Sequence, residues 1–134
     1  MNPGAIDQEE EIRRFAWKAE AGADFAVTQP VFDVESFLSF VKQVEEFGVP
    51  IIAGLCPPLS LRNVEFLANE VPGITVPSDV IERMRTAQDG GETAAHREGI
   101  ALTREVLDGI RGAIAGVMVS APRGRVDRAI AVLD

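Results

Sequence analysis

Apolar residues recur at every third or fourth position in several parts of the chain, which is the spacing of one face of an α-helix. In the first such stretch, Ile12 and Phe15 share a face. Asp7 can cap the start of this helix with Glu10 as its capping-box partner, and Gly22 is a typical stop. Further helices are predicted from Asp33 to Gly48, from Ser60 to about Asn69, from Ser78, from about Ala95 to Gly112 and from about Val126.

Three short apolar runs lie between the helical stretches and predict strands, at Phe25–Gln29, Pro50–Gly54 and Gly116–Ala121. The second run is apolar throughout, as in a strand that is covered on both faces. Strands that alternate with helix-length segments predict β/α units and a parallel sheet. We therefore expect an α/β fold with about three parallel strands and surrounding helices. The Gly90–Gly91 pair within Gln88–Thr93 predicts a linker or mobile loop.

Composition narrows the class of protein without changing this fold. The 134 residues suit one domain, which we expect to cover residues 1–134. The net charge of −8 has the opposite sign to that of a protein that binds nucleic acid through its phosphates. No apolar run has the roughly 18 residues of a membrane span, and Met1–Gly4 lacks the features of a secretory signal. The single cysteine, Cys56, cannot form an intramolecular disulfide, so a reducing cytoplasm is the expected location.

Ligands of parallel α/β folds bind beyond the carboxyl ends of the strands. Gln29 ends the first predicted strand, and its amide offers two donors and an acceptor, which suits the edge of a heterocycle. Alternatively, this amide only satisfies a neighbouring loop backbone.

The other candidates for chemistry are weaker. Cys56 could be a nucleophile, but His96, the only histidine, is distant in sequence, which favours a small, partly buried residue at a turn. Arg123 and Arg125 either bind a phosphate or carboxylate or belong to a solvated turn. One cysteine and one histidine are poor material for a zinc site, and we expect no metal.

One long stretch resembles a known family. Glu11–Asp33 contains a Lys-x-x-Ala-Gly-Ala motif from Lys18 to Ala23, followed by Thr28 and Gln29. It resembles the methylenetetrahydrofolate reductase family, in particular the form fused to a homocysteine methyltransferase in some bacteria. The similarity continues in order through Pro50–Gly54, Ser60–Leu67 and Val117–Pro122. It covers the C-terminal part of that family's (β/α)8 TIM barrel, from just after the fifth strand through the eighth.

The resemblance implies a folate site on this chain. Gln29 matches a glutamine that hydrogen-bonds the pterin of the folate. Phe66 or Leu67 lies where an apolar side chain packs on the aminobenzoate ring, and both remain candidates.

The resemblance also implies contacts with an FAD cofactor. Lys18 matches a lysine that contacts the phosphate region of FAD, and Glu11 lies where an acidic side chain contacts the same cofactor. Asn2 and Pro3 match the loop that shapes the cofactor pocket, although Asn2 stands where many members have a histidine. The family's general-acid glutamate and an aspartate near the flavin lie in the half of the barrel that is not matched, so no catalytic residue is assigned.

The function implied by the resemblance is that of a flavoprotein oxidoreductase of one-carbon metabolism and methionine biosynthesis. The family reduces 5,10-methylenetetrahydrofolate to 5-methyltetrahydrofolate, with hydride passing from NAD(P)H to FAD and then to the folate. Because half of the site is not matched, we expect this chain alone to be inactive and not to retain FAD. The alternatives are a non-catalytic truncated or engineered half-barrel with only a structural or self-association role, and another barrel enzyme, such as a pterin-binding methyltransferase or an aldolase.

Assembly follows from the size of the predicted sheet. Three β/α units cannot close an eight-stranded barrel, so two sheet edges and an apolar face are expected to be open. Ile51, Ile52, Val117 and Val119 supply side chains that would fill a barrel interior or pack under helices. A homodimer, or pairing with the missing N-terminal half, is therefore expected.

Overall fold

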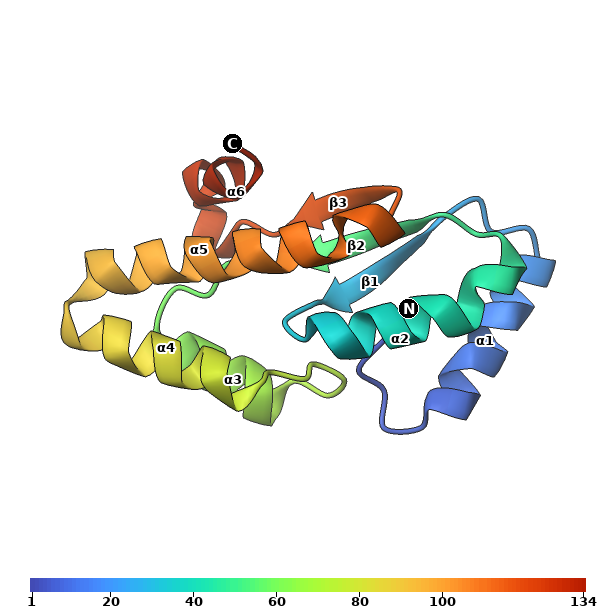
Figure 1. Ribbon diagram of the computed structural model, residues 1–134, viewed down its shortest axis with the longest axis horizontal. Helices are drawn as coiled ribbons and strands as arrows, with labels where there is room; N and C mark the ends of the chain where they lie inside the picture. Colours follow the sequence, from blue (N-terminus) through green and yellow to red (C-terminus); the bar gives the residue numbers. More distant parts are fainter.

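The computed structural model describes residues 1–134, in which helices and strands alternate (Figure 1). The helices are α1 (Gln8–Glu20), α2 (Val34–Val44), α3 (Leu61–Glu70), α4 (Ser78–Asp89), α5 (Glu92–Ile110) and α6 (Val126–Leu133). The strands are β1 (Ala26–Pro30), β2 (Ile51–Leu55) and β3 (Gly116–Val119). Short 3₁₀ turns, η1 (Glu45–Phe47), η2 (Arg111–Ala113) and η3 (Pro122–Gly124), follow α2, α5 and β3.

The three strands form one parallel sheet in the order β1-β2-β3. Ala26 of β1 lies opposite Ile51 of β2, and Ile52 of β2 lies opposite Gly116 of β3. The connection from β1 to β2 contains α2, and the connection from β2 to β3 contains α3, α4 and α5. The predicted α/β class with three parallel strands is therefore confirmed, and the arrangement is consistent with part of a (β/α)8 barrel.

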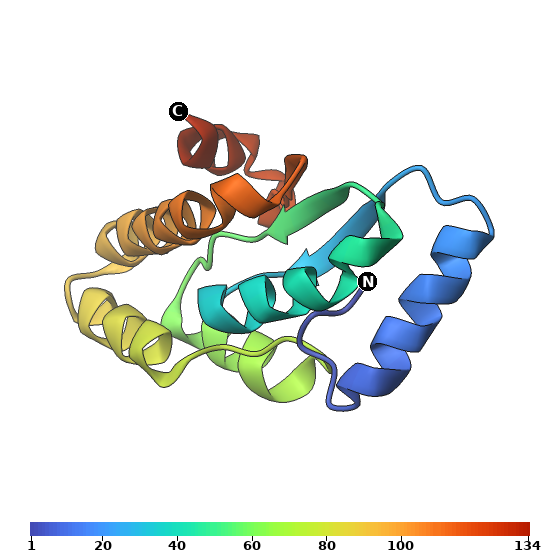
Figure 2. The same ribbon diagram turned by 45° about the vertical axis from the view of Figure 1, so that its right-hand side comes forward.

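Helices α2 and α5 cover one face of the sheet (Figures 1 and 2). From β2, Ile51, Ala53 and Leu55 point to this face and are 6%, 0% and 0% exposed. They belong to a cluster of 12 buried residues, whose helical members include Phe37, Phe40, Val106, Leu107 and Ile110. This cluster is the main core of the molecule.

The opposite face of the sheet has no helix packed on it (Figures 1 and 2). Side chains alternate along a strand, so Val27 of β1, Ile52 of β2 and Met118 of β3 share this face. Met118 is 49% exposed. We call the surface formed by these three residues the open face.

The structure divides the four strand residues expected at open surfaces between the two sides. Ile52 lies on the open face, whereas Ile51, Val117 and Val119 pack in or against the main core. The outer edge of β1 is also partly paired, because the backbone of Met1 hydrogen-bonds to it. The sheet is therefore less open at this edge than the sequence predicts.

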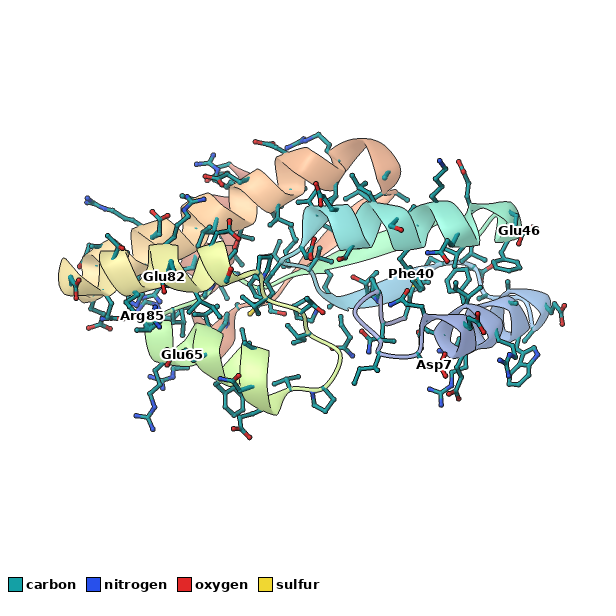
Figure 3. All side chains as sticks on the ribbon, turned by 60° about the horizontal axis from the view of Figure 1, so that its bottom comes forward. Asp7, Phe40, Glu46, Glu65, Glu82 and Arg85 are labelled. Carbon is teal, nitrogen blue, oxygen red and sulfur yellow. The ribbon has the colours of Figure 1, made fainter.

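A second cluster of seven buried residues lies between α3, α4 and the first half of α5; its members are Phe32, Val64, Ile74, Val80, Met84, Ala95 and Leu102. Ion pairs support the same layer: Arg85 of α4 contacts Glu82 of its own helix and lies 3.5 Å from Glu65 of α3 (Figure 3). Gly99 of α5 lies so close to the carbonyl oxygen of Pro58 that a Cβ would collide with it. The layer thereby fixes the loop that follows β2.

Three of the predicted helix caps are confirmed. The side chains of Asp7, Asp33 and Ser60 each accept a hydrogen bond from the backbone N–H three residues later, at 2.9, 3.0 and 3.0 Å. Glu10 does not complete the capping box at Asp7, because its carboxylate lies 3.1 Å from Arg14, one turn further along α1. Figure 3 shows Asp7 at the start of that helix.

Two predicted boundaries are wrong. Ser78 is the first residue of α4 rather than its cap; it follows Pro77, and its side chain makes no capping bond. The connection predicted at Gln88–Thr93 is shorter than expected, because α4 extends to Asp89 and α5 begins at Glu92. Gly90 and Gly91 alone connect the two helices, and Gly91 turns the chain with a φ of 98°. Because glycine adopts this conformation without strain, the connection between the two helices can be short.

None of the helices is long and apolar enough to cross a membrane.

Candidate functional site

The carboxyl ends of β1 and β2 are locked together by Thr28. Its buried hydroxyl accepts a hydrogen bond from the N–H of Gly54 at 3.0 Å and donates one to the carbonyl of Gln29 at 2.8 Å. The register of the two strands shifts between Val27 and Pro30. A Cβ at Gly54 would approach the carbonyl oxygen of Thr28 to 2.5 Å, so only glycine fits there. Thr28 and Gly54 therefore set the position of Gln29.

Gln29 is exposed at the end of β1, and its side-chain amide makes no hydrogen bond within the protein. Its backbone N–H donates to the carbonyl of Met1 at 3.0 Å, which holds the strand end in place. The alternative expectation, that the amide satisfies a neighbouring loop, is therefore wrong. Both donors and the acceptor of the amide are available to a ligand.

The N-terminal segment runs beside β1 and joins it to α1. The amino group of Met1 donates to the carbonyl of Val27 at 3.1 Å. The carboxylate of Glu11, which is 9% exposed, accepts a hydrogen bond from the backbone N–H of Asn2 at 2.8 Å. The side chain of Asn2 accepts a bond from the N–H of Gly4 at 3.2 Å. Glu11 and Asn2 thus fix each other and shape the segment.

Lys18 lies on α1 on the other side of the same segment. It lines a largely apolar cavity of about 180 Å³, together with Met1, Phe15, Phe25 and Val27. The pKa of the Met1 amino group is lowered by burial and, secondly, by the charge of Lys18, while Glu11 acts in the opposite direction. Lys18 itself is exposed and makes no ion pair. It therefore offers an uncompensated positive charge at the rim of this cavity.

The structure thus brings four of the six predicted site residues together around the N-terminal segment: Asn2, Glu11, Lys18 and Gln29. Phe66 and Leu67 lie apart from them on α3. Leu67 packs against the second cluster, whereas Phe66 is 55% exposed. The two side chains therefore differ in their exposure to solvent, and both remain candidates for a ligand contact.

Cys56 lies in the loop after β2 and is half-buried. Burial raises the pKa of its thiol, so the nucleophilic thiolate is disfavoured at neutral pH. No three His, Cys, Asp or Glu side chains come together in an arrangement that could hold a metal ion. The observations favour a packing role for Cys56.

A basic cavity of about 520 Å³ lies at the carboxyl end of β3. The sequence does not predict that its lining residues come together. His96 of α5 and Arg128 of α6 line it beside Arg123 and Arg125 of the turn after β3. The sequence predicts the turn that contains Arg123 and Arg125, but the spacing of the residues does not predict that His96 lies beside it. Arg128 falls on the same helical face as Val132, and such a face signals burial rather than binding.

Taken together, these observations describe an α/β protein with polar side chains near the carboxyl ends of parallel strands. The family model for methylenetetrahydrofolate reductase matches residues 1–116. A probable methylenetetrahydrofolate reductase (NADPH) of Caenorhabditis elegans is 27% identical over 112 residues, which are 80% of this chain and 17% of the relative. The 5,10-methylenetetrahydrofolate reductase of Escherichia coli is 28% identical over 95 residues, 69% of this chain and 32% of the relative.

This chain belongs to the methylenetetrahydrofolate reductase family. It spans about a third or less of the length of these two relatives. A solved structure from Clostridium thermocellum, of a protein that binds two copies of 5-methyl-5,6,7,8-tetrahydrofolic acid, superposes with a TM-score of 0.67 and 20% identity. The superposition covers 92% of this chain and 47% of that one and supports the fold.

Proposed function

We propose that this chain is part of a flavin-dependent reductase that converts 5,10-methylenetetrahydrofolate to 5-methyltetrahydrofolate with NAD(P)H. Membership of the family supports the reaction, and the exposed amide of Gln29 at the carboxyl end of β1 supports the folate site. In this proposal the chain supplies part of the folate site and part of the cofactor site, and the remaining groups come from elsewhere in a complete barrel.

The observation that carries the proposal is the free amide of Gln29. It is exposed at a strand end, where ligands of this fold class bind, and it has no competing partner in the protein. A pterin presents alternating ring nitrogens, a carbonyl and an amino group, which one amide can bind as both donor and acceptor. Gln29 would orient the folate, and Thr28, through the Gly54 N–H, would keep Gln29 in place.

The residues near the N-terminal segment fit part of an FAD site. The exposed ammonium of Lys18 has no ion pair and can neutralise a phosphate. Glu11 and Asn2 would act mainly by holding the segment, because the carboxylate of Glu11 already accepts the N–H of Asn2. Bound FAD would supply the transfer of hydride from NAD(P)H to the folate.

The folate's aminobenzoate ring needs an apolar contact, for which Phe66 and Leu67 are the candidates on α3. Replacing each by alanine in turn tests the choice. The residue in contact should weaken folate binding, whereas Leu67, which packs on the second cluster, should also lower the free energy of unfolding.

The open face supports a partner for this chain. Parallel sheets are normally covered on both faces, and here no helix packs on the face of the sheet to which Val27, Ile52 and Met118 belong. We propose that a second copy, or an N-terminal half-barrel, packs on this face. The chain alone is then expected to show no reductase turnover, because losing a general acid alone costs about 10²–10⁴ in rate.

The deciding experiment uses calorimetry to measure the affinity of the 134-residue chain for 5-methyltetrahydrofolate. Gln29→Ala should weaken binding at least about tenfold, as expected for losing hydrogen bonds to a buried heterocycle. Gln43→Ala, at an exposed glutamine of α2, is the matched control and should bind like the wild type. Equal affinities for the wild type and Gln29→Ala would exclude the proposed role of Gln29.

The cofactor part is tested separately with FAD. Trp17, the only tryptophan, is 62% exposed on α1 next to Lys18, so its fluorescence reports on a flavin bound there. If the chain is combined with an N-terminal half from the same family, Lys18→Ala should weaken FAD binding more than folate binding. Gln29→Ala should show the reverse order.

A further inference from the structure

The N-terminal segment, residues 1–5, contacts the turn at residues 71–74, which follows α3 (Figure 2). Gly4 lies against the backbone of Gly73, and a Cβ at position 4 would collide with the carbonyl oxygen of that residue. The side-chain amide of Asn2 occupies the space where a Cβ of residue 73 would lie. We call the contact between Asn2, Gly4 and Gly73 the glycine clamp. It requires glycine on both sides.

Both sides of the glycine clamp are held in place by other contacts. On the segment side, the side-chain amide of Gln8 donates hydrogen bonds to the carbonyls of Pro3 and Ala5, each at 2.8 Å. On the turn side, Gly73 has a φ of 83°, and the next residue, Ile74, is buried in the second cluster. Neither side can therefore make room for an added Cβ without losing hydrogen bonds or core contacts.

The clamp connects two parts of the candidate folate site. On the segment side, the carbonyl of Met1 accepts the backbone N–H of Gln29 at 3.0 Å. On the turn side, the clamp follows directly on α3, whose C-terminal half carries Phe66 and Leu67. The start of α3 is attached to β2 through the loop that Gly99 fixes. The clamp is thus a second attachment of α3, at the end that carries the candidate apolar contacts.

We propose that the glycine clamp fixes the separation between Gln29 and the C-terminal half of α3, so that Asn2, Gly4 and Gly73 are positioning residues for a folate. This inference rests on the proposed function, in which Gln29 binds the pterin and a side chain of α3 packs on the aminobenzoate ring. The two rings of a folate are joined by a short covalent bridge, so the groups that bind them must lie at a matching distance. A change in that distance weakens binding of the whole folate more than binding of a pterin alone.

The clamp is opened with the variant Gly4→Ala. Its Cβ meets the backbone of Gly73, and position 4 has no left-handed φ that would add strain of its own. Gly112→Ala is the matched control, because a Cβ at Gly112 has no atom within 4 Å and its φ is also not left-handed. The two variants therefore differ in the clamp and not in the kind of substitution.

The first measurement is amide hydrogen exchange of the 134-residue chain without ligand. The exchange rate of the Gln29 amide reports on its hydrogen bond to Met1. In Gly4→Ala this rate should rise at least about tenfold over the control, because the segment opens more readily from β1. The amide of Val31, which donates to the carbonyl of Gly54 at 3.0 Å, is the internal reference and should keep its rate. An unchanged rate at Gln29 would overturn the proposal.

The second measurement compares two ligands by calorimetry, 5-methyltetrahydrofolate and 6-methyltetrahydropterin, which lacks the aminobenzoate ring. Gly4→Ala should weaken the affinity for the folate by about tenfold, because the ring no longer meets its apolar contact. The affinity for the pterin should change by less than about twofold, since Thr28 still holds the end of β1. The control should bind both ligands like the wild type.

The outcomes separate the clamp from the proposed function. If the wild type binds neither ligand, the proposed function fails, and the folate role of the clamp fails with it. If the wild type binds both and Gly4→Ala weakens both equally or neither, only the clamp is overturned.

A second pair of variants decides if Gly4→Ala does not fold, as judged by circular dichroism. Gly73→Ala and Gly48→Ala both place alanine at a left-handed φ, of 83° and 65°, but only the first meets the side chain of Asn2. A loss of folate affinity confined to Gly73→Ala would support the clamp. Equal affinities of the two variants would overturn it.

Discussion

The two faces of the sheet differ in what covers them, although the same three strands form both. On the helix-covered face, Ile51, Ala53 and Leu55 are almost completely buried among side chains of α2 and α5. On the open face, Ile52 is only partly covered and Met118 is half exposed. Successive residues of one strand therefore have very different environments, because the side chains of a strand alternate between the two faces.

This difference shows which face of the sheet is covered by the chain's own helices. The covered face has a core of 12 buried residues. The open face has apolar side chains without a covering layer, and the polar Gln29 at its end is without a partner. Stability is thus concentrated on one side of the sheet, and the groups available for binding lie on the other side and at the strand ends. The predictions below test this contrast.

The largest effect is expected from removing a covered side chain. Leu55→Ala should lower the free energy of unfolding by about 2–5 kcal/mol, because Leu55 is 0% exposed and the cavity cannot close easily. Met118→Ala, on the open face, should change it by no more than about 0.5 kcal/mol in the monomer. Urea unfolding of both variants measures the difference. Similar losses at the two positions would show that the open face is covered in solution.

Self-association is the next test. If a second copy covers the open face, Ile52→Lys should convert the dimer to a monomer, because burial of each isoleucine contributes about 1.5–3 kcal/mol. Leu38→Lys, at a partly exposed leucine on the outer side of α2, is the control and should leave the dimer intact. Sedimentation at micromolar concentration gives the masses. A wild-type chain that is a compact monomer under these conditions would contradict the dimer.

The lock at the strand ends should have a moderate effect. Thr28→Val leaves the buried N–H of Gly54 without its acceptor, which is expected to cost about 1–3 kcal/mol. The same change should weaken folate binding, since Thr28 positions the end of β1 that carries Gln29. Thr93→Val, at an exposed threonine of α5, should alter neither property. Calorimetry with 5-methyltetrahydrofolate and urea unfolding test both parts, and unchanged folate binding in Thr28→Val would show that the lock does not position Gln29.

The smallest effect concerns pH. Burial and Arg128 lower the pKa of His96 from its ordinary value of 6.5, so the unfolded chain takes up this proton first as the pH falls. The contribution of His96 to stability is therefore present above pH 6.5 and is lost as the pH falls from 6.5 through the folded pKa. His96→Gln should flatten this part of the curve of unfolding free energy against pH. Parallel curves for the two proteins would contradict the lowered pKa.

Much of the fold could be predicted from local patterns. The alternation of apolar runs and helical periods predicted three parallel strands, and Asp7, Asp33 and Ser60 were recognised as caps because each acts on backbone groups three residues away. The errors at Ser78 and at Gln88–Thr93 have the same origin. Glycine and serine signal a break in a helix, but the packing of α4 against α5 decides how long the connection is.

For the candidate site, too, some features follow from the sequence and others only from the tertiary structure. The sequence by itself determined the α/β class, the strand that ends in Gln29 and the likeness to a family, since these depend on the order of residue types along the chain. Only the tertiary structure decided that Glu11 holds Asn2, that Thr28 fixes Gly54 and that His96 and Arg128 meet at one cavity. The physical reason is that hydrogen bonds and electrostatic fields depend on distances in space, and residues far apart in sequence reach those distances only after the helices have packed on the sheet.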